Sequence, residues 1–558
     1  MSTSTATPDG PAPTGEYTHQ QIVTILTGLL LGMFLGSLDQ TIVSTAIRTI
    51  ADDLHGLDAQ AWATTAYLVT STITTPIYGK LGDLWGRKKL FMFAITVFVI
   101  GSTLCTLSTS MYELAAFRAF QGLGAGGLFT LVLAIVGDIV SPRERAKYTG
   151  YFMATFGSSS VLGPVIGGFF AGTGTILGIA GWRWVFLVNV PIGILALVVV
   201  YRTLHVHHVK RAARVDWMGA VALVVCLVPL LTVAEQGRSW GWASGRSLAC
   251  FIVGAAGLLG FVVVERHLRD DALIPLRIFR IRPAAITLVA SVIVGMALFG
   301  GMMVLPLYMQ IVHGASPTES GFMMLPMVLG LMSAAFSSGR IISRTGRTRI
   351  FPIVGSALMA VGMFLLAQIT ADTPLWLVMV FMLITGYGVG NCMQPLILTV
   401  QSSVPPTEIG VATSSATFFR QIGGTIGVAV FLSILFAAVP GNIASALEDA
   451  ATTQSYQQAV AAALEEPASS PDHRLASGES SVITGISQDS SIINRLDPVL
   501  AHPLKVGFAE SMTPIFWTAG GLGVLALLVL ATMPEVELRA TSAAAARAAA
   551  MPTEPERR

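Results

Sequence analysis

The feature that most constrains this chain is a series of apolar segments, each long enough to cross a membrane. A transmembrane helix needs about 20 predominantly apolar residues, and by that criterion the sequence contains about fourteen candidate spans. This pattern predicts an all-helical membrane protein. The spans lie near residues 21–47, 62–79, 89–108, 112–137, 146–171, 182–203, 216–235, 246–265, 283–310, 321–338, 350–370, 374–397, 411–437 and 512–533.

Composition excludes several other functions. Charged residues make up 11% of the 558 residues, whereas soluble domains carry about 25%. The basic residues occupy short loops, so the net charge of +2 predicts no nucleic-acid partner. The chain has no Walker-type phosphate loop and no nucleophile–base set, which argues against direct use of ATP and against an enzyme. The four cysteines lie in apolar runs and the nine histidines form no metal-ligand spacing, so we expect no metal site and no cofactor.

The distribution of basic residues predicts the orientation in the membrane. One set of alternate loops is rich in arginine and lysine, and the other set is poor in them. Because cytoplasmic loops carry the excess of these residues, the first set should be cytoplasmic, with both termini on that side of the cell membrane. The basic set comprises Lys80, 87–89, Arg143, Arg145, Lys147, Arg202, Lys210, Arg211, Arg214, 266–282 and 340–349.

An internal repeat predicts the domain organisation. Segment 339–349 is similar to segment 79–89, and GLGAGG at 122–127 aligns with GYGVGN at 386–391 at an offset of 264 residues. We therefore expect an N-terminal six-helix bundle and a matching C-terminal bundle. The expected bounds are 21–203 for the first and 283–437 plus 512–533 for the second, with two inserted helices and their basic flanks at 204–270. Parallel halves of this kind predict a central cavity that opens alternately to either side.

The remaining segments are polar. Residues 1–20 are expected to form a disordered cytoplasmic tail, and 534–558 a second cytoplasmic tail. Residues 438–511 should form an extracytoplasmic loop, helical near 444–466 and flexible near 467–481. A gating lid, a partner-docking site and a passive insertion all remain open for this loop, and passive insertion is the default.

Two charged residues lie inside predicted spans. Asp39 lies in the first span, about 13 Å below its outer end, and Arg118 lies in the fourth span, about 10 Å below its outer end. Their similar depth suggests that they meet. A carboxylate at such depth is costly unless it is paired, protonated or directed into a cavity, so we consider Asp39 a candidate proton carrier. A structural bond between helices, and an arginine that extends to the outer surface, are the simpler alternatives.

The segment GKLGDLWGRKKL at 79–90 predicts a very short, tightly turned loop between two spans. Gly79 and Gly86 permit close approach and positive φ. Asp83 can cap a helix or pair with a base across the interface between the repeats. Arg87 and Lys88 should hold the loop on the cytoplasmic side.

The fifth span carries GSSSVLGPVIGG at 157–168. Its small residues recur at a spacing of four, which allows a neighbouring helix backbone to approach closely, and a proline inside the helix removes one hydrogen bond. Simple helix packing can explain such spacing in many proteins. The residues of this motif are Gly157, Gly163, Pro164, Gly167 and Gly168.

Together these motifs resemble the major facilitator superfamily, in particular its fourteen-helix drug:proton antiporters, over residues 24–539. The segment 79–90 is similar to the family signature, and 157–168 is similar to the antiporter motif. Further similarities lie at 38–46, 182–193, 273–279 and 418–424, whereas Ser44, Leu84 and Ser343 depart from the usual pattern. The resemblance implies that Asp39 serves substrate-coupled proton exchange, that Arg118 assists proton transfer, and that the Asp83 loop is a conformational latch.

A further set of residues could contact substrate or stabilise the interface between the halves. Arg420 and Gln421 are polar groups inside the second half, and a bracing role is the simpler interpretation for both. Two methionines belong to a cluster whose flexible side chains would suit a permissive pocket, although such residues more often pack in a core. The full set is Gln40, Gln121, Arg420, Gln421, Met302 and Met303.

The sequence thus favours a proton-coupled exporter of amphipathic or cationic organic compounds, with protons, a small organic substrate and the lipid bilayer as its partners. An exporter dedicated to one endogenous product, such as an antibiotic, lipid or siderophore, is the nearest alternative. A membrane scaffold or receptor that acts through 438–511 is a third. Neither the substrate nor the oligomeric state follows from the sequence.

Overall fold

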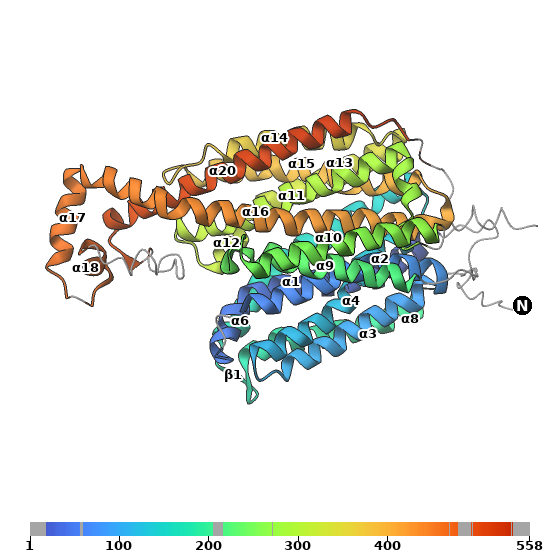
Figure 1. Ribbon diagram of the computed structural model, residues 1–558, viewed down its shortest axis with the longest axis horizontal. Helices are drawn as coiled ribbons and strands as arrows, with labels where there is room; N and C mark the ends of the chain where they lie inside the picture. The colour runs from blue at the N-terminus through green and yellow to red at the C-terminus, as the bar shows by residue number, and fades with distance from the viewer. Residues whose placement is uncertain are drawn as a thin grey trace, which may run out of the picture.

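The computed structural model describes residues 18–55, 60–204, 216–269, 272–467, 469–477, 493, 495–536 and 538. In these residues it is an elongated bundle of roughly parallel helices (Figure 1). Twelve of the described helices are long and apolar enough to cross a membrane. The 26-residue helix α2 and the shorter apolar helix α14 run beside them. The architecture is therefore all-helical and consistent with the predicted number of about fourteen spans.

The N-terminal half of the bundle comprises the elements up to α8. A two-stranded hairpin, with Thr175 opposite Ala180, connects α6 to the helical turn before α7. The helices are α1 (His19–Asp53), α2 (Gln60–Trp85), α3 (Arg87–Thr106), α4 (Met111–Ile139), α5 (Pro142–Arg145), α6 (Thr149–Gly172), α7 (Trp184–Leu187) and α8 (Asn189–Thr203), and the strands are β1 (Thr175–Ile176) and β2 (Ile179–Ala180).

The C-terminal half comprises α11 to α16 together with α20. Its helices are α11 (Arg282–Ile311), α12 (Pro317–Met323), α13 (Leu325–Thr345), α14 (Ile350–Leu366), α15 (Leu375–Ser402), α16 (Ile409–Ala451) and α20 (Pro498–Ala531). The inserted helices α9 (Trp217–Trp240) and α10 (Gly245–Leu268) pack on each other, and α9 contacts both α2 and α16. The inserted pair therefore contacts both halves (Figure 1).

The two halves repeat one helix crossing. In the first half, Gly122 and Gly126 of α4 lie against the backbone of α2, where an added Cβ would come within 2.6 Å of the Tyr67 carbonyl oxygen and 2.4 Å of that of Ser71. In the second half, Gly386 and Gly390 of α15 meet the backbone of α13 in the same way. The paired glycine motifs of the sequence thus perform the same packing task twice.

Several helix ends differ from the expected ones. The helices that contain the predicted spans 411–437 and 512–533 are longer than those spans, because α16 continues to Ala451 and α20 begins at Pro498. Both helices extend beyond the bundle, and α17 (Gln454–Leu464) and α18 (Pro471–Ala476) lie at that far end (Figure 1). The segment between the two long helices is consequently shorter than 438–511. A hydropathy criterion ends a span where polar residues begin, but a helix that leaves the membrane can continue in water.

The expectations for the polar segments were partly wrong. His19 and Gln20 belong to α1, which a capping box at Thr18 begins, so the expected tail 1–20 is too long by these residues. Part of the segment expected to be flexible, 467–481, forms α18. The rest of the N-terminal tail, most of 534–558 and residues 478–481 lie outside the described residues.

Candidate functional site

A buried ion pair between Asp39 and Arg118 lies inside the N-terminal half. Asp39 is in α1 and Arg118 is in α4, and the arginine Nη1 lies 2.6 Å from the Asp39 Oδ2. The side chains are 0% and 1% exposed. The two charged residues that sequence depth placed at a similar height therefore meet. Neither side chain is directed at lipid or water.

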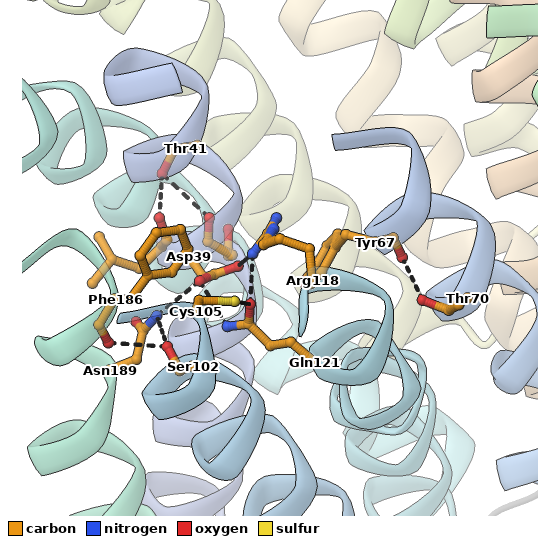
Figure 2. A network of polar contacts seen from close by, with 12 residues as sticks. Asp39, Thr41, Tyr67, Thr70, Ser102, Cys105, Arg118, Gln121, Phe186 and Asn189 are labelled. Atoms are coloured by element: carbon orange, nitrogen blue, oxygen red, sulfur yellow. Dashed lines mark hydrogen bonds and ion pairs between the residues drawn. The ribbon is translucent and has the colours of Figure 1, made fainter. Parts of the chain in front are cut away.

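Two amides complete the surroundings of the Asp39 carboxylate (Figure 2). Gln121 of α4 and Asn189 of α8 both donate to Oδ1, over 2.9 Å and 2.8 Å. Gln121 also accepts a bond of 2.7 Å from Arg118. Each carboxylate oxygen thus has at least one donor, and the three donors come from α4 and α8.

The guanidinium of Arg118 also contacts aromatic rings. It lies 4.0 Å from the centroid of the Tyr67 ring in α2, and 6.0 Å from that of Phe186 in α7. Such contacts stabilise a cation where water is excluded. The site thereby joins five helices, α1, α2, α4, α7 and α8, of the N-terminal half.

Sequence reasoning missed part of this network. Asn189 also donates to the Ser102 hydroxyl over 3.0 Å, and Ser102 donates to the Phe186 carbonyl over 2.9 Å. Gln121, which was grouped with possible substrate or interface contacts, belongs instead to the Asp39 network and accepts a long bond from Cys105. The available signal for Asn189 was an amide within the apolar run WVFLVNVPIG.

The glycine motif of α6 lies between two neighbours. On one side, an added Cβ at Gly163 would come 2.5 Å from the Thr41 Cβ of α1, and one at Gly167 would come 2.8 Å from the Ile42 carbonyl oxygen. On the other side, Gly157 faces Val328 of α13. Pro164 faces Gly321 of α12, and Gly168 is partly exposed. The motif therefore packs on α1 next to Asp39 and also contacts the C-terminal half.

The segment 79–90 differs from the expected loop. Gly79 and Asp83 are inside α2, and the connection to α3 is the single residue Gly86, whose φ of 95° requires glycine. Gly79 is needed for close packing rather than for a turn, because an added Cβ would lie 2.4 Å from the Ser414 Cβ of α16. Lys88 donates to the Tyr201 carbonyl of α8 over 2.8 Å, a contact within the N-terminal half.

Asp83 links the two halves at this end of the bundle. Its Oδ1 accepts from Arg87 over 2.7 Å, and its Oδ2 accepts from the backbone N–H of Val411, in the first turn of α16, over 3.1 Å. Arg87 also pairs with Asp138 of α4 over 3.0 Å. A negative charge at a helix N-terminus is favourable, so the carboxylate holds α16 against α2.

Two further arginines cross between the halves nearby. Arg143 donates to the Ser343 and Arg344 carbonyls at the end of α13, over 2.8 Å and 2.6 Å. Arg145, which is buried, donates to the side-chain carbonyl of Gln401 in α15. The end of the bundle that carries the α2–α3 connection is therefore closed by several bonds between the halves.

The other candidate contact residues are dispersed. Gln421 of α16 accepts a bond of 3.2 Å from Thr75 of α2, again across the halves. Arg420 is partly buried, and Gln40 is exposed on α1. The side chains of Met302 and Met303 lie outside the described part of the structure. Among the residues that the structure describes, no three His, Cys, Asp or Glu side chains are grouped to hold a metal ion.

Comparisons with known proteins agree on the family. The sequence profile of the Major Facilitator Superfamily matches residues 29–428. An uncharacterized MFS-type transporter of Mycobacterium tuberculosis is 33% identical over 517 residues, covering 92% of this chain and 70% of that protein. The multidrug transporter protein MdtP of Bacillus subtilis is 36% identical over 405 residues, which are 72% of this chain and 73% of MdtP.

The fold comparison gives the same result. The proton:xylose symporter XylE of known structure superposes with a TM-score of 0.55 at 15% identity, over 95% of this chain and 100% of XylE. At this identity the likeness concerns the fold alone. The chain therefore belongs to the major facilitator superfamily, as a multi-pass membrane transporter rather than an enzyme.

Proposed function

We propose that the protein is a proton-coupled antiporter that exports amphipathic or cationic organic compounds across the cell membrane, with both termini in the cytoplasm. The observation that carries this proposal is the buried Asp39 carboxylate with its basic partner Arg118. A carboxylate inside a membrane is a candidate proton carrier when its environment can favour either protonation state. The names of its relatives, a multidrug transporter and several efflux pumps, support export as the direction of transport.

The proposed cycle couples Asp39 to the movement of the two halves, which we take to be α1–α8 and α11–α16 with α20. When the site faces outward, a proton binds Asp39 and releases Arg118 from the ion pair. When the site faces inward, the proton leaves, Arg118 restores the ion pair, and the protein accepts a substrate. Each charge that crosses the membrane supplies about 2.3 kcal/mol per 100 mV, so one or two protons can drive useful accumulation.

The other motifs have roles in this cycle. The Asp83–Arg87 group would be a latch that stabilises the conformation closed at the cytoplasmic end. The glycines of α6 would maintain a tight contact that moves as one unit with α1. The extended segment of α17 and α18 would then lie outside the cell, with no role in the proton step.

An efflux assay with ethidium tests the proposal. Wild-type protein in energised cells should export the dye, and dissipating the proton gradient should stop export while ATP remains. Asp39→Asn should reduce the gradient-driven rate by at least tenfold, because the amide cannot take up and release a proton. Arg118→Ala should lower the rate without lowering the amount of protein in the membrane. A wild-type rate in Asp39→Asn would refute the role of Asp39.

A dedicated exporter of one endogenous product is the second candidate. The observation that favours it is a relative named as the MFS-type transporter of an acurin A biosynthesis cluster, 32% identical over 409 residues. A panel of structurally unrelated compounds separates the two candidates, because a multidrug exporter should move several of them and a dedicated exporter only one.

A further inference from the structure

Arg420 is a basic residue in the middle of the bundle without a hydrogen-bond or ion-pair partner among the described residues. It lies eleven residues after the start of α16 at Ile409, which is about 16 Å along the helix. That depth is close to the centre of a hydrocarbon layer about 30 Å thick. In the described part of the chain, its guanidinium makes neither a hydrogen bond nor an ion pair.

The three buried arginines differ from Arg420, which is partly buried. Arg118 pairs with Asp39, and Arg87 pairs with Asp83 and Asp138. Arg145 donates to Gln401 and to two carbonyl oxygens. An unpaired guanidinium at membrane depth is unfavourable. Arg420 therefore differs from these three arginines, each of which has bonded partners.

Few acidic residues lie on the helices that contact α16. Of these helices, α11 and α15 contain no aspartate or glutamate. Asp83 of α2 lies at the first turn of α16 and pairs with Arg87, and Glu510 of α20 is exposed. Among the described side chains, none therefore supplies a carboxylate to Arg420, and an anion from another molecule can fill that role.

The position of Arg420 on α16 directs it toward the interior. Thr417, Gly424 and Thr413 share its helix face, at spacings of three, four and seven residues from Arg420. All three are buried. The exposed residues Ile426 and Val430 belong to a different face.

The residues around Arg420 place it where the halves meet. The adjacent Gln421 accepts the bond from Thr75 of α2. Gly295 of α11 packs directly on the Arg420 backbone, where an added Cβ would lie 2.3 Å from its carbonyl oxygen. This contact holds the base of the side chain in position. Gln421 therefore makes a bracing bond between the halves, whereas Arg420 makes none.

We propose that Arg420 binds an acidic group of exported compounds, so that amphipathic organic acids are among the cargoes. The planar guanidinium matches carboxylate, sulfonate and phosphate groups with two parallel hydrogen bonds. An anion at this place would neutralise the unpaired charge and would contact the interface between the halves. The inference rests on the proposed export function, and it adds organic acids to the cationic compounds named there.

The test is equilibrium binding to the full chain in lipid nanodiscs, without a proton gradient. The probes are pairs that differ in the acidic group: 1-anilinonaphthalene-8-sulfonate against N-phenyl-1-naphthylamine, and decanoate and decyl phosphate against decanol. Wild-type protein should bind at least one acid about tenfold more tightly than its uncharged counterpart. Arg420→Gln should abolish that preference, and Arg246→Gln, which removes an exposed arginine of α10, should retain it.

The stability of the variants separates binding from bracing. Because Arg420 has no partner among the described residues, Arg420→Gln should not lower the unfolding temperature, whereas loss of a brace would. If Arg420→Gln does not fold, Arg420→Lys is the variant to compare with the wild type. It keeps the positive charge but cannot form two parallel hydrogen bonds, so it should bind the acid at least threefold more weakly. Equal binding within every probe pair, or an unchanged preference in these variants, would overturn the proposal.

The same binding experiment with Asp39→Asn keeps the two proposals apart. If the protein still prefers the acids but shows no proton-driven export, only the proton cycle is rejected. Gradient-driven export of ethidium with no acid preference in any probe pair would reject only the role of Arg420.

Discussion

At the scale of single residues, the Asp39 site is defined by the several donors that share one carboxylate. Three side-chain donors hold its two oxygens, and the site is closed to solvent. Hydrogen bonds to charged groups contribute about 1.5–3 kcal/mol each. The loss of a single one of these donors should therefore alter transport measurably.

We therefore expect Asn189→Ala to slow gradient-driven export. The change removes one donor from Oδ1 and leaves Arg118 and Gln121 in place. Losing a hydrogen bond to a charged group, about 1.5–3 kcal/mol, should lower the rate by roughly tenfold or more. The measurement is gradient-driven export in proteoliposomes that contain equal amounts of each protein.

Ser102→Ala is the matched control for that prediction. Ser102 accepts from the same Asn189 amide but does not touch Asp39. Its loss should change the export rate much less than the loss of Asn189. Equal rates for the two variants, at equal amounts of folded protein, would contradict this role of Asn189.

The sequence revealed the charged members of this site more readily than the neutral ones. Asp39 and Arg118 stand out because a charge within an apolar run is expensive. Asn189 and Ser102 are far less expensive to bury, so their presence in apolar runs carried little signal. Their partnership depends on how α3 and α8 are placed around α1, which the spacing along the chain does not specify.

At the scale of elements, α6 has little room for larger side chains beside α1. Its Gly163 faces Thr41 of α1, two residues from Asp39. Gly163→Ala should force the two helices apart and destabilise the protein by about 1–3 kcal/mol, the usual result of overpacking. Gly172→Ala is the matched control, because nothing lies within 4 Å of an added Cβ there.

The comparison is made by thermal unfolding in detergent and by export of ethidium. Gly163→Ala should lower both the unfolding temperature and the rate, and Gly172→Ala should change neither. Equal unfolding temperatures for the two variants would show that the α1–α6 contact adapts without cost, contrary to the packing argument.

Helix existence was easier to predict than helix extent. Length and hydropathy indicated the spans correctly because the bilayer imposes both. The ends of α16 and α20 could not be predicted in this way, because beyond the membrane the two helices are stabilised by contact with each other. Gly507 of α20, for example, lies against the Ile443 backbone of α16.

At the scale of the whole molecule, several contacts join the two halves at the end that carries the α2–α3 connection. Asp83, Arg143 and Arg145 join the halves at that end. The inserted pair α9 and α10 also connects them, since Phe418 of α16 packs in one cluster with Val69 of α2 and Leu223 of α9. The internal repeat predicted two halves, but it carried no information on where the inserted pair would lie.

The last prediction concerns the Asp83 latch. Asp83→Asn removes the charge that accepts from Val411 and pairs with Arg87. The closed state should lose about 1.5–3 kcal/mol, which is roughly a tenfold to hundredfold change in the ratio of closed to open molecules. Spin labels at Lys89 and Arg347, exposed positions on the two halves, should then report longer distances. Glu144→Gln is the control, because in the described part of the chain the Glu144 carboxylate accepts from Ser141 of its own half and reaches no residue of the other half. An unchanged distance distribution in Asp83→Asn would mean that Arg143 and Arg145 alone hold this end closed.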